Sequence, residues 1–433
     1  MYSKLKQFSN FSRAVTTSAT CFRPDQEADI TPMLKESCPQ GWLARGNGLS
    51  YNDSCLLQNG HILDTSRLNH LLDFDAASGL VVCQAAATFA DLLLVNKNYI
   101  PPVLPGTLLA TVAGGIAHDV HGKNNHREAS FGHHIKWLEL QVGSKNIYCD
   151  ATKHDELFRA TISGLGLTGV IRRAGIQLRQ SSRWIAKRSQ KYDDLPALLH
   201  TMQGEGLSQD YQVAWVDLLN EPRALLFYGN HTAPSVEVKR KQFQQRTLPK
   251  ISLPLIQRWF LKQFNKAYFH QSSSKIELVP LWQFNNPLDA VKNWNYLYGK
   301  KGLLQFQGVF PQNTALETLQ SLHKIIQTHQ ATPTLAVLKL FTQEGAGLLS
   351  FAKPGFTLAV DFKNNAAANA AIKAMNQYIV ELHGNIYLAK DTFLTREQFQ
   401  SLYPNYKSLQ AILSKYQSPM RSDLSRRVGI HHE

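Results

Sequence analysis

The sequence lacks the features that would place it in a membrane or secreted class. No window holds about 18 consecutive apolar residues, so we expect no transmembrane helix. The first 20 residues contain no apolar h-region, so we expect no secretory signal. Cysteine is scarce and odd in number, and no CxxC pair occurs, which favours reduced thiols in a cytoplasmic protein. The five cysteines are Cys21, Cys38, Cys55, Cys83 and Cys149.

Repeats of fixed period and low-complexity tracts are also absent, so the chain reads as globular. Its 433 residues allow two domains. The formal net charge of +14 is the unusual property. It favours an anionic partner, whether nucleic acid, a membrane surface or a phosphorylated substrate.

Glycine and small residues gather between residues 101 and 134, in PPVLPGTLLATVAGGIAHDVHGKNNHREASFGHH. Pro105-Gly106 and Gly114-Gly115 indicate turns, and a backbone this bare lets another molecule approach closely. We interpret the stretch as a wall around a large, flat, anionic ligand; a glycine-rich surface loop is the alternative. Five histidines lie here at spacings that match no zinc pattern, so we expect no metal. They are His118, His121, His126, His133 and His134.

Local patterns predict the main elements. Residues 1–40 have the character of an irregular arm with a few short elements. Residues 61–69 and 79–96 are predicted to form a strand, a turn, a strand around Val81-Val82 and a helix at 89–95. Other predicted elements are a hairpin at 135–151, strands at 302–310, 334–342 and 355–362, and helices at 315–329 and 364–384. The later order, β-α-β-β-α, favours an antiparallel sheet with helices on one face.

Two motifs carry alternative interpretations. Gly164, Gly166 and Gly169 form a GxGxxG, but a helical segment precedes it and a strand follows, the reverse of a dinucleotide site, so we predict a tight bend. In residues 235–270 basic and aromatic side chains interleave. This pattern suits nucleic acid, a peripheral membrane patch with Trp259, Phe260 and Phe264 at the interface, or a solvated loop.

From residue 40 onwards the chain resembles the vanillyl-alcohol-oxidase, or PCMH-type, FAD-binding superfamily. RGNGLSYND, PVLPGT with TVAGGIAHDVHGKNNHREASFGHH, and GLGLTGVI occur in the expected order. LLQFQGVFP, VLKLF, VDF, IYLAKD and SDLSRR resemble a branch that oxidises a polyprenyl-phosphate-linked ribose. The likeness implies an α+β fold in two domains. A PCMH-type FAD-binding domain would comprise residues 1–185 completed by 385–433, and an antiparallel-sheet substrate domain with helices would comprise 186–384.

The resemblance also implies the site. Tyr51, His121 and Lys390 would be catalytic, with Lys390 as the cation and Tyr51 or His121 handling the proton. The residues that would line FAD are Arg45, Gly46, Asn47, Gly48, Leu49, Ser50, Tyr51, Asn52, Gly106, Thr107, Thr111, Val112, Ala113, Gly114, His118, His121, Val170 and Tyr387. Those that would face the substrate are Lys123, Trp215, Gln305, Gln307, Lys339 and Lys390.

Four positions depart from the family pattern. Many members attach FAD to a histidine where this chain has Leu49, so we predict non-covalent FAD. Ala359 replaces a cysteine, Thr357 an asparagine and Asn285 a tyrosine, so the lipid and sugar are open and cysteine-directed covalent inhibitors should fail.

The implied reaction oxidises the 2′-hydroxyl of a polyprenyl-phosphate-linked ribose to a ketone, with hydride transfer to flavin N5, as the first half of an epimerisation towards an arabinose donor. A short-chain dehydrogenase/reductase would complete it. We expect a cytoplasmic protein with peripheral contact on the inner face of the membrane. An oxidase of a free sugar or aldonolactone is one alternative, and a basic nucleic-acid-binding protein is another.

Overall fold

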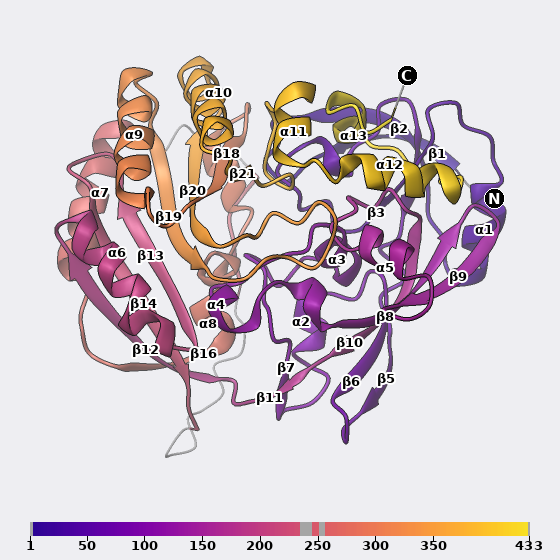
Figure 1. The fold of residues 1–433 in the computed structure, drawn as a ribbon, viewed down its shortest axis with the longest axis horizontal. Helices are drawn as coiled ribbons and strands as arrows, with labels where there is room; N and C mark the ends of the chain where they lie inside the picture. The colour runs from indigo at the N-terminus through magenta and orange to yellow at the C-terminus, as the bar shows by residue number, and fades with distance from the viewer. Residues whose placement is uncertain (1–2, 234–244, 251–255, 432–433) are drawn as a thin grey trace.

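The computed structural model describes residues 3–233, 245–250 and 256–431. It mixes helices with mainly antiparallel sheets, which confirms the predicted α+β class. Figure 1 shows an N-terminal part beside a second part built on one large sheet, with the C-terminal helices returning over the N-terminal part. None of the helices described is long and apolar enough to cross a membrane.

A four-stranded sheet opens the chain, in the order β1-β2-β4-β3. Its strands are β1 (Ser3–Ser9), β2 (Thr16–Phe22), β3 (Trp42–Arg45) and β4 (His61–Asp64). The prediction of an irregular arm over residues 1–40 is therefore wrong for β1 and β2, which pair antiparallel over their full length. Their inward positions include Thr17 and Ala19. Such small or polar residues weaken the apolar alternation by which a strand is recognised.

The second sheet of the N-terminal part has the order β5-β6-β10-β8-β9. Its strands are β5 (Leu71–Asp75), β6 (Leu80–Gln84), β8 (Ile135–Val142), β9 (Lys145–Asp150) and β10 (Val170–Gln177), and its helices are α2 (Phe89–Leu92), α3 (Val112–Ala117) and α5 (Asp155–Thr161). The hairpin predicted at 135–151 is confirmed by β8 and β9. Helix α2 ends three residues before the predicted helix. A capping box at Thr88 and Asp91 begins the helix, which ends at Leu92, and Leu94 beyond it is exposed.

The GxGxxG glycines lie between α5 and β10, so the predicted order of helix, bend and strand is confirmed. The bend packs on α3, because Ser163 N donates to Ile116 O at 2.9 Å and Leu165 N donates to Ala117 O at 2.9 Å. The bend is thus joined to the middle of the glycine-rich stretch, at α3.

An eight-stranded antiparallel sheet forms the second part, in the order β16-β12-β14-β13-β19-β20-β18-β21. Its strands are β12 (Trp184–Tyr192), β13 (Tyr211–Asp217), β14 (Arg223–His231), β16 (Glu277–Pro280), β18 (Leu303–Phe310), β19 (Pro333–Phe341), β20 (Gly355–Lys363) and β21 (Asn385–Ile386). Helices α6 (Leu195–Gln203), α9 (Ala315–Thr328) and α10 (Ala366–Glu381) pack with one face of this sheet in the largest core cluster. The predicted order β-α-β-β-α is confirmed by β18, α9, β19, β20 and α10.

The chain then crosses back through α11 (Arg396–Leu402), α12 (Tyr406–Lys415) and α13 (Asp423–Arg427). Trp42 forms a parallel bridge with Met420, and Asp423 N donates to Leu56 O at 2.8 Å, so the C-terminal segment is tied to the first sheet. These contacts join the C-terminal segment to the N-terminal part, in line with the proposal that 385–433 completes 1–185. The proposed bounds do not coincide with the strands, because β21 pairs with β18 of the large sheet and β12 begins at Trp184, before the proposed start of 186–384. Short elements complete the fold: α1 (Ile30–Leu34), α4 (Asn125–Glu128), α7 (Arg258–Gln271), α8 (Leu281–Asn285), β7 (Tyr99–Ile100), β11 (Arg179–Gln180), β15 (Arg246–Thr247) and β17 (Val291–Lys292).

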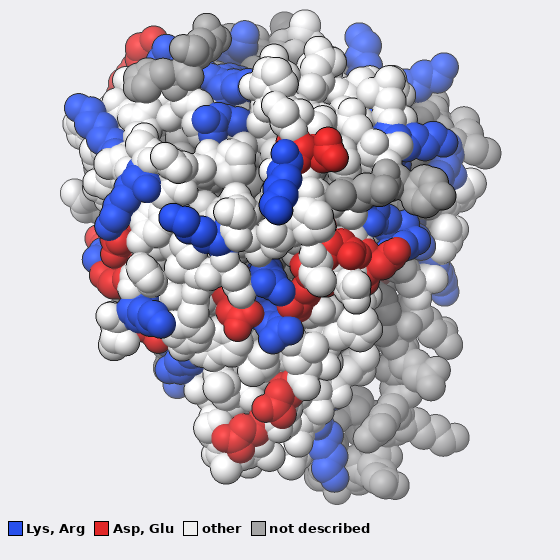
Figure 2. All heavy atoms as spheres, turned by 90° about the vertical axis from the view of Figure 1, so that its right-hand side faces the viewer, with Lys and Arg blue, Asp and Glu red and all other residues white. Residues whose placement is uncertain are grey.

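Charge is mixed on the face shown in Figure 2, which looks onto the right-hand side of Figure 1. Lys and Arg side chains alternate there with Asp and Glu side chains. The positive excess of the chain is therefore not gathered into one patch among the described residues of this face.

Candidate active site

A cavity of about 1050 Å³ is lined both by the N-terminal part and by the uncovered face of the eight-stranded sheet. Most predicted site residues line it. They are Arg45, Gly46, Asn47, Gly48, Leu49, Ser50, Tyr51, Gly106, Thr107, Thr111, Ala113, Gly114, His118, His121, Lys123, Trp215, Gln305, Gln307, Lys339, Tyr387 and Lys390.

Three predicted cofactor residues do not line the cavity. Val170 packs in the core with Trp42 and Met420, and its backbone pairs with β8. Val112 is buried at the start of α3, and its N–H donates to Ala87 O at 2.7 Å. Asn52 is fully buried and caps the turn after it by accepting from Ser54 N. None of the three side chains lines the cavity, whereas their neighbours in sequence do, and the resemblance alone could not distinguish these cases.

The wall over residues 46–51 and 106–111 is made of two loops that fit closely. A Cβ added at Gly46 would lie 2.6 Å from Thr111 Oγ1, and one added at Gly48, whose φ is +63°, would lie 1.9 Å from the Arg45 guanidinium. Asn47 Nδ2 also donates to Leu109 O at 2.8 Å. Only glycine allows this approach. At Gly106 nothing lies within 4 Å of an added Cβ, so this part of the backbone faces open space.

Arg45 holds the first loop in place from beneath. Its Nη2 donates to Ser9 O at 2.9 Å and its Nε donates to Cys55 O at 3.2 Å. These bonds join β3 to β1 and to the turn that follows the loop. Part of the Arg45 side chain still lines the cavity, but its hydrogen bonds brace the loop.

His118 offers a polar atom that the protein leaves unpaired. Its Nε2 lies 3.4 Å from both Ser50 Oγ and Ser54 Oγ, whereas its buried Nδ1 has no hydrogen-bond partner. Burial, and then the charge of Lys390, lower the pKa of His118 to about 4, so the imidazole is neutral at pH 7. A bare backbone wall with a buried, unpaired imidazole nitrogen fits a cofactor that brings its own polar groups. FAD is such a cofactor.

Lys390 lies above the ring of Tyr51, with Nζ 3.3 Å from the ring centre. Burial lowers the pKa of Lys390 to about 7, a shift that Lys339 increases and Asp361 opposes. Burial likewise raises the pKa of Asp361 to about 6, while Gln305 Nε2 donates to its Oδ1. Sequence reasoning missed Asp361. The available signal was a single carboxylate inside the apolar strand 355–362.

His121 is held between two strands of the large sheet. Its Nδ1 lies 3.2 Å from Lys339 Nζ, and its Nε2 lies 3.1 Å from Gln307 Nε2. Burial and the charge of Lys339 lower the pKa of His121 well below its usual value, so its ring is neutral. A neutral imidazole accepts only one hydrogen bond at its ring nitrogens, so the Lys339 ammonium and the Gln307 amide compete for it. Whichever of Lys339 and Gln307 does not bond to His121 can donate a hydrogen bond to a ligand.

Lys123 adds a third buried cation. Its Nζ donates to Phe284 O at 2.6 Å, and burial lowers its pKa to about 7. Burial lowers the pKa of Lys339 to about 8. Within the part of the chain described here, Lys123, Lys339 and Lys390 form no ion pair with a carboxylate. Three buried lysines without a directly ion-paired carboxylate, of which only Lys390 has a nearby acidic charge, that of Asp361, favour an anionic ligand.

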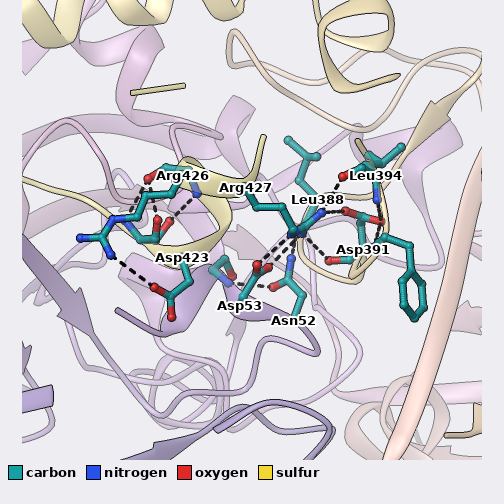
Figure 3. A network of polar contacts seen from close by, with 12 residues as sticks. Asn52, Asp53, Leu388, Asp391, Leu394, Asp423, Arg426 and Arg427 are labelled. Carbon is teal, nitrogen blue, oxygen red and sulfur yellow. Dashed lines mark hydrogen bonds and ion pairs between the residues drawn. The ribbon is translucent and has the colours of Figure 1, made fainter. Parts of the chain in front are cut away.

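A buried ion-pair network joins the segments that carry Tyr51 and Lys390 (Figure 3). Arg427 binds Asp53 through two bonds of 2.9 Å and Asp391 Oδ2 at 3.0 Å. Tyr51 N also donates to Ala389 O at 3.1 Å. Helix α13, which carries Arg427, thus holds the segment of Tyr51 and the segment of Lys390 together. Sequence reasoning noted SDLSRR only as part of the family pattern.

The other residues that depart from the family pattern do not all line the cavity. Ala359 and Asn285 line the cavity, whereas Thr357 is buried and accepts from Gln307 Nε2 at 3.3 Å. Among the described residues no group of three His, Cys, Asp or Glu side chains is arranged to hold a metal ion. His126 and His134 instead bond to the backbone oxygens of Gln209 and Glu128.

Comparisons with known proteins fit this geometry. A family model described as an FAD binding domain matches residues 19–144. The chain is 31% identical to the decaprenylphosphoryl-β-D-ribose oxidase of Mycolicibacterium smegmatis, over 96% of either chain. It is 24% identical to an uncharacterized protein from the mprA 5′ region of Streptomyces coelicolor, over 78% of this chain and 98% of that protein. It is 28% identical to an uncharacterized oxidoreductase from the fasciation locus of Rhodococcoides fascians, over 41% of either chain. The predicted cofactor, FAD, and the predicted class, an FAD-dependent oxidoreductase, are confirmed.

Proposed function

Because the chain belongs to the family of decaprenylphosphoryl-β-D-ribose oxidases, we propose that it oxidises the 2′-hydroxyl of a ribose joined through phosphate to a polyprenyl lipid. The observation that carries the proposal is the set of three unpaired buried cations, Lys123, Lys339 and Lys390, on the wall of the cavity that also contains the glycine cradle. A phosphodiester supplies the counter-charge that these cations lack.

The roles of the residues follow from their charge states. FAD, when bound along residues 46–51 and 106–118, supplies the acceptor for the hydride. Lys390 and Lys339 orient the sugar and its phosphate, and neutral His121 is the group that accepts the hydroxyl proton. Tyr51 supports Lys390 with its ring. Burial raises the pKa of Tyr51 well above its usual value, so its hydroxyl stays protonated.

The function is tested with purified protein in two steps. Visible absorbance before and after acid precipitation is expected to show FAD released to the supernatant, since Leu49 cannot form the covalent bond of a histidine. Oxidation is then measured on a polyprenyl-phosphoryl ribose, on free ribose and on an aldonolactone. Turnover of the lipid-linked sugar alone supports the proposal. Turnover of the free sugar or of the lactone alone would replace the proposal by an oxidase of that substrate. Flavin retained in the pellet would refute the prediction, made from Leu49, that FAD is bound non-covalently.

The proposal predicts a fall in kcat/KM as pH rises. The pKa values of Lys123 and Lys390 are about 7 and that of Lys339 is about 8. The three side chains are therefore cationic below these values and lose their charge above them. We expect kcat/KM for the phosphate-linked substrate to decline from about pH 7 upwards, because kcat/KM reports the free enzyme. A profile that is flat or rises between about pH 6 and 9 would contradict the assignment of these lysines.

The ketone product requires a second enzyme if the sugar is to be epimerised. We propose a reductase of the short-chain class as this partner, because a 2-keto sugar becomes the arabinose epimer when hydride is delivered to the opposite face.

The lipid tail of such a substrate belongs in a membrane. We therefore propose that the protein makes peripheral contact with the inner face of the membrane.

Helix α7 supports the membrane contact. Trp259 and Phe260 are 70% and 50% exposed, beside the basic residues of the same helix. The predicted basic and aromatic segment was 235–270, of which 235–244 and 251–255 lie outside the described residues. We expect the protein to co-sediment with anionic liposomes and much less with neutral ones, and Trp259→Ser with Phe260→Ser to weaken binding roughly tenfold. Absence of binding to both kinds of liposome would rule out this contact.

A further inference from the structure

One face of the eight-stranded sheet forms a floor that changes from polar to apolar across the strands. Gln307 pairs with Ala359, Ala359 with Val337, and Val337 with Trp215. Residues paired across neighbouring strands project on the same side, and all four line the cavity. At about 4.8 Å per strand, the row runs roughly 14 Å from Gln307 to Trp215.

The polar end of the row is the end where the proposed chemistry lies. Gln307 bonds to His121, and the next row of the floor holds Gln305 and Asp361, which pair with each other across β18 and β20. Two of the three buried lysines are on this side, because Lys339 lies beside His121 and Lys390 feels the charge of Asp361, whereas Lys123 lies against Phe284 and β13, towards the other end of the row. The reacting sugar and its phosphate are thus placed at this end.

At the apolar end, helix α7 lies on β13 and β14. Asn265 Nδ2 donates to Asp217 Oδ1 at 2.8 Å, and Phe269 is buried against Trp215 and Leu225. This anchoring directs a second face of the helix towards the cavity. Phe264 and Tyr268 lie on that face, and both line the cavity.

The aromatic side chains continue the floor to the surface. The Trp215 and Tyr268 rings are 5.1 Å apart, and the Tyr268 and Phe264 rings are stacked at 6.0 Å. Phe264 is 52% exposed and Tyr268 is 40% exposed, although each is part of the cavity wall. Apolar rings that face both a cavity and solvent are costly in water, unless an apolar molecule covers them.

From this continuity we infer that the floor between Val337 and Phe264 binds the first isoprene units of the substrate's lipid, and that the tail leaves the protein over the α7 aromatic row, Phe264 and Tyr268. The inference rests on the proposed function and assigns a second subsite to it. The phosphate binds the cations at the polar end, and the chain runs along the row away from them. Helix α7 contains no acidic residue, so nothing on it repels an anionic lipid or an anionic membrane surface.

The test uses ribosyl phosphates of geranyl, farnesyl and geranylgeranyl chains with the FAD-loaded enzyme. The apolar floor spans one strand spacing from Val337 to Trp215 and continues over ring separations of 5.1 Å to Tyr268 and 6.0 Å to Phe264. A corridor of roughly 16 Å covers most of a farnesyl chain, so KM should fall roughly tenfold or more from geranyl to farnesyl and then level off. Phe264→Ser with Tyr268→Ser should raise KM for the farnesyl substrate roughly tenfold, with kcat unchanged and the geranyl substrate little affected. The control is Leu94→Ser with Ile276→Ser, which replaces two apolar side chains that are 75% and 72% exposed and lie outside both the cavity wall and α7.

A binding measurement separates this inference from the proposed reaction. Calorimetric titration with farnesyl phosphate, which has no sugar to oxidise, should show binding that the Phe264 and Tyr268 substitutions weaken and the control does not. If farnesyl phosphate binds in this way but the ribosyl substrates are not oxidised, the tail site stands and the proposed reaction falls. If the ribosyl substrates are oxidised with a KM independent of chain length and of Phe264 and Tyr268, the tail site is refuted.

Discussion

Replacing Lys390 with methionine is expected to lower kcat/KM by about two to three orders of magnitude, which is the usual cost of removing one charged group aimed at a reacting centre. Methionine keeps most of the length of the side chain and removes the charge that lies 3.3 Å from the Tyr51 ring centre. It also leaves the buried carboxyl of Asp361 with one fewer opposing charge, so the pKa of Asp361 should rise further. Steady-state kinetics on the lipid-linked ribose measures the effect.

Two control variants isolate the role of Lys390. Lys407→Met removes an exposed lysine of α12 and should leave kcat/KM unchanged. Tyr51→Phe keeps the ring beneath Lys390 and should cost less than about tenfold, because burial already keeps the hydroxyl protonated. FAD absorbance shows that each variant is loaded. Activity of Lys390→Met within about threefold of the parent would remove Lys390 from the reacting centre.

Replacing Arg427 with methionine is expected to lower the free energy of unfolding by about 3–5 kcal/mol. Asp391 has a fully buried side chain and Asp53 is nearly buried, and Arg427 is the ion-pair partner of both (Figure 3). Asp391 also accepts from Asn376 Nδ2 and from the backbone N–H groups of Phe393 and Leu394, but none of these donors carries a charge. Burial acts to lower the pKa of Arg427, but Asp391 and Asp53 outweigh it and raise that pKa, so the side chain is always charged. Urea unfolding followed by far-UV circular dichroism measures the loss.

The neighbouring residue provides a matched control. Arg426 is 3.8 Å from Asp423 in a more exposed pair, so Arg426→Met should cost less than about 1 kcal/mol. Arg427→Lys retains the charge but loses the paired bonds to Asp53, and its cost should fall between the two. Because the network joins the Tyr51 and Lys390 segments, Arg427→Met should also release FAD at a lower urea concentration. Equal losses for Arg427→Met and Arg426→Met would show that the network adds no stability.

Local pattern was sufficient where the residues that define an element are neighbours in sequence. The hairpin β8–β9 follows from alternating residues around Gly143-Ser144, and α9 follows from its helical periodicity. Pattern failed for β1 and β2, because sheet pairing stabilises those strands and their inward residues include threonine and alanine. The pattern also predicted too long a helix at 89–95. The helical periodicity continues beyond Leu92, where α2 ends and the side chains cease to be buried.

The cofactor cradle belongs to what the sequence determined by itself. Its two glycine-containing loops are short contiguous motifs, and the need for glycine is local, because an added Cβ would meet Thr111 or Arg45. A short contiguous motif of this kind can be recognised from the sequence, whatever its position in the fold. The glycines by themselves indicated a wall around a large anionic ligand. FAD and the oxidoreductase class came from the family resemblance of the motifs taken together, and the comparisons confirm both.

Only the tertiary structure decided which charged residues act together. Lys390 and Tyr51 come together because Asn52 donates to Leu388 O across 336 residues of sequence, and because Arg427 binds both segments. Asp361 is one of 32 acidic residues, and composition gives no reason to select it. Its burial, and the change of the sheet floor from Gln307 to Trp215, depend on the alignment of four strands. Strand alignment is set by packing between distant segments, and local sequence does not contain that information.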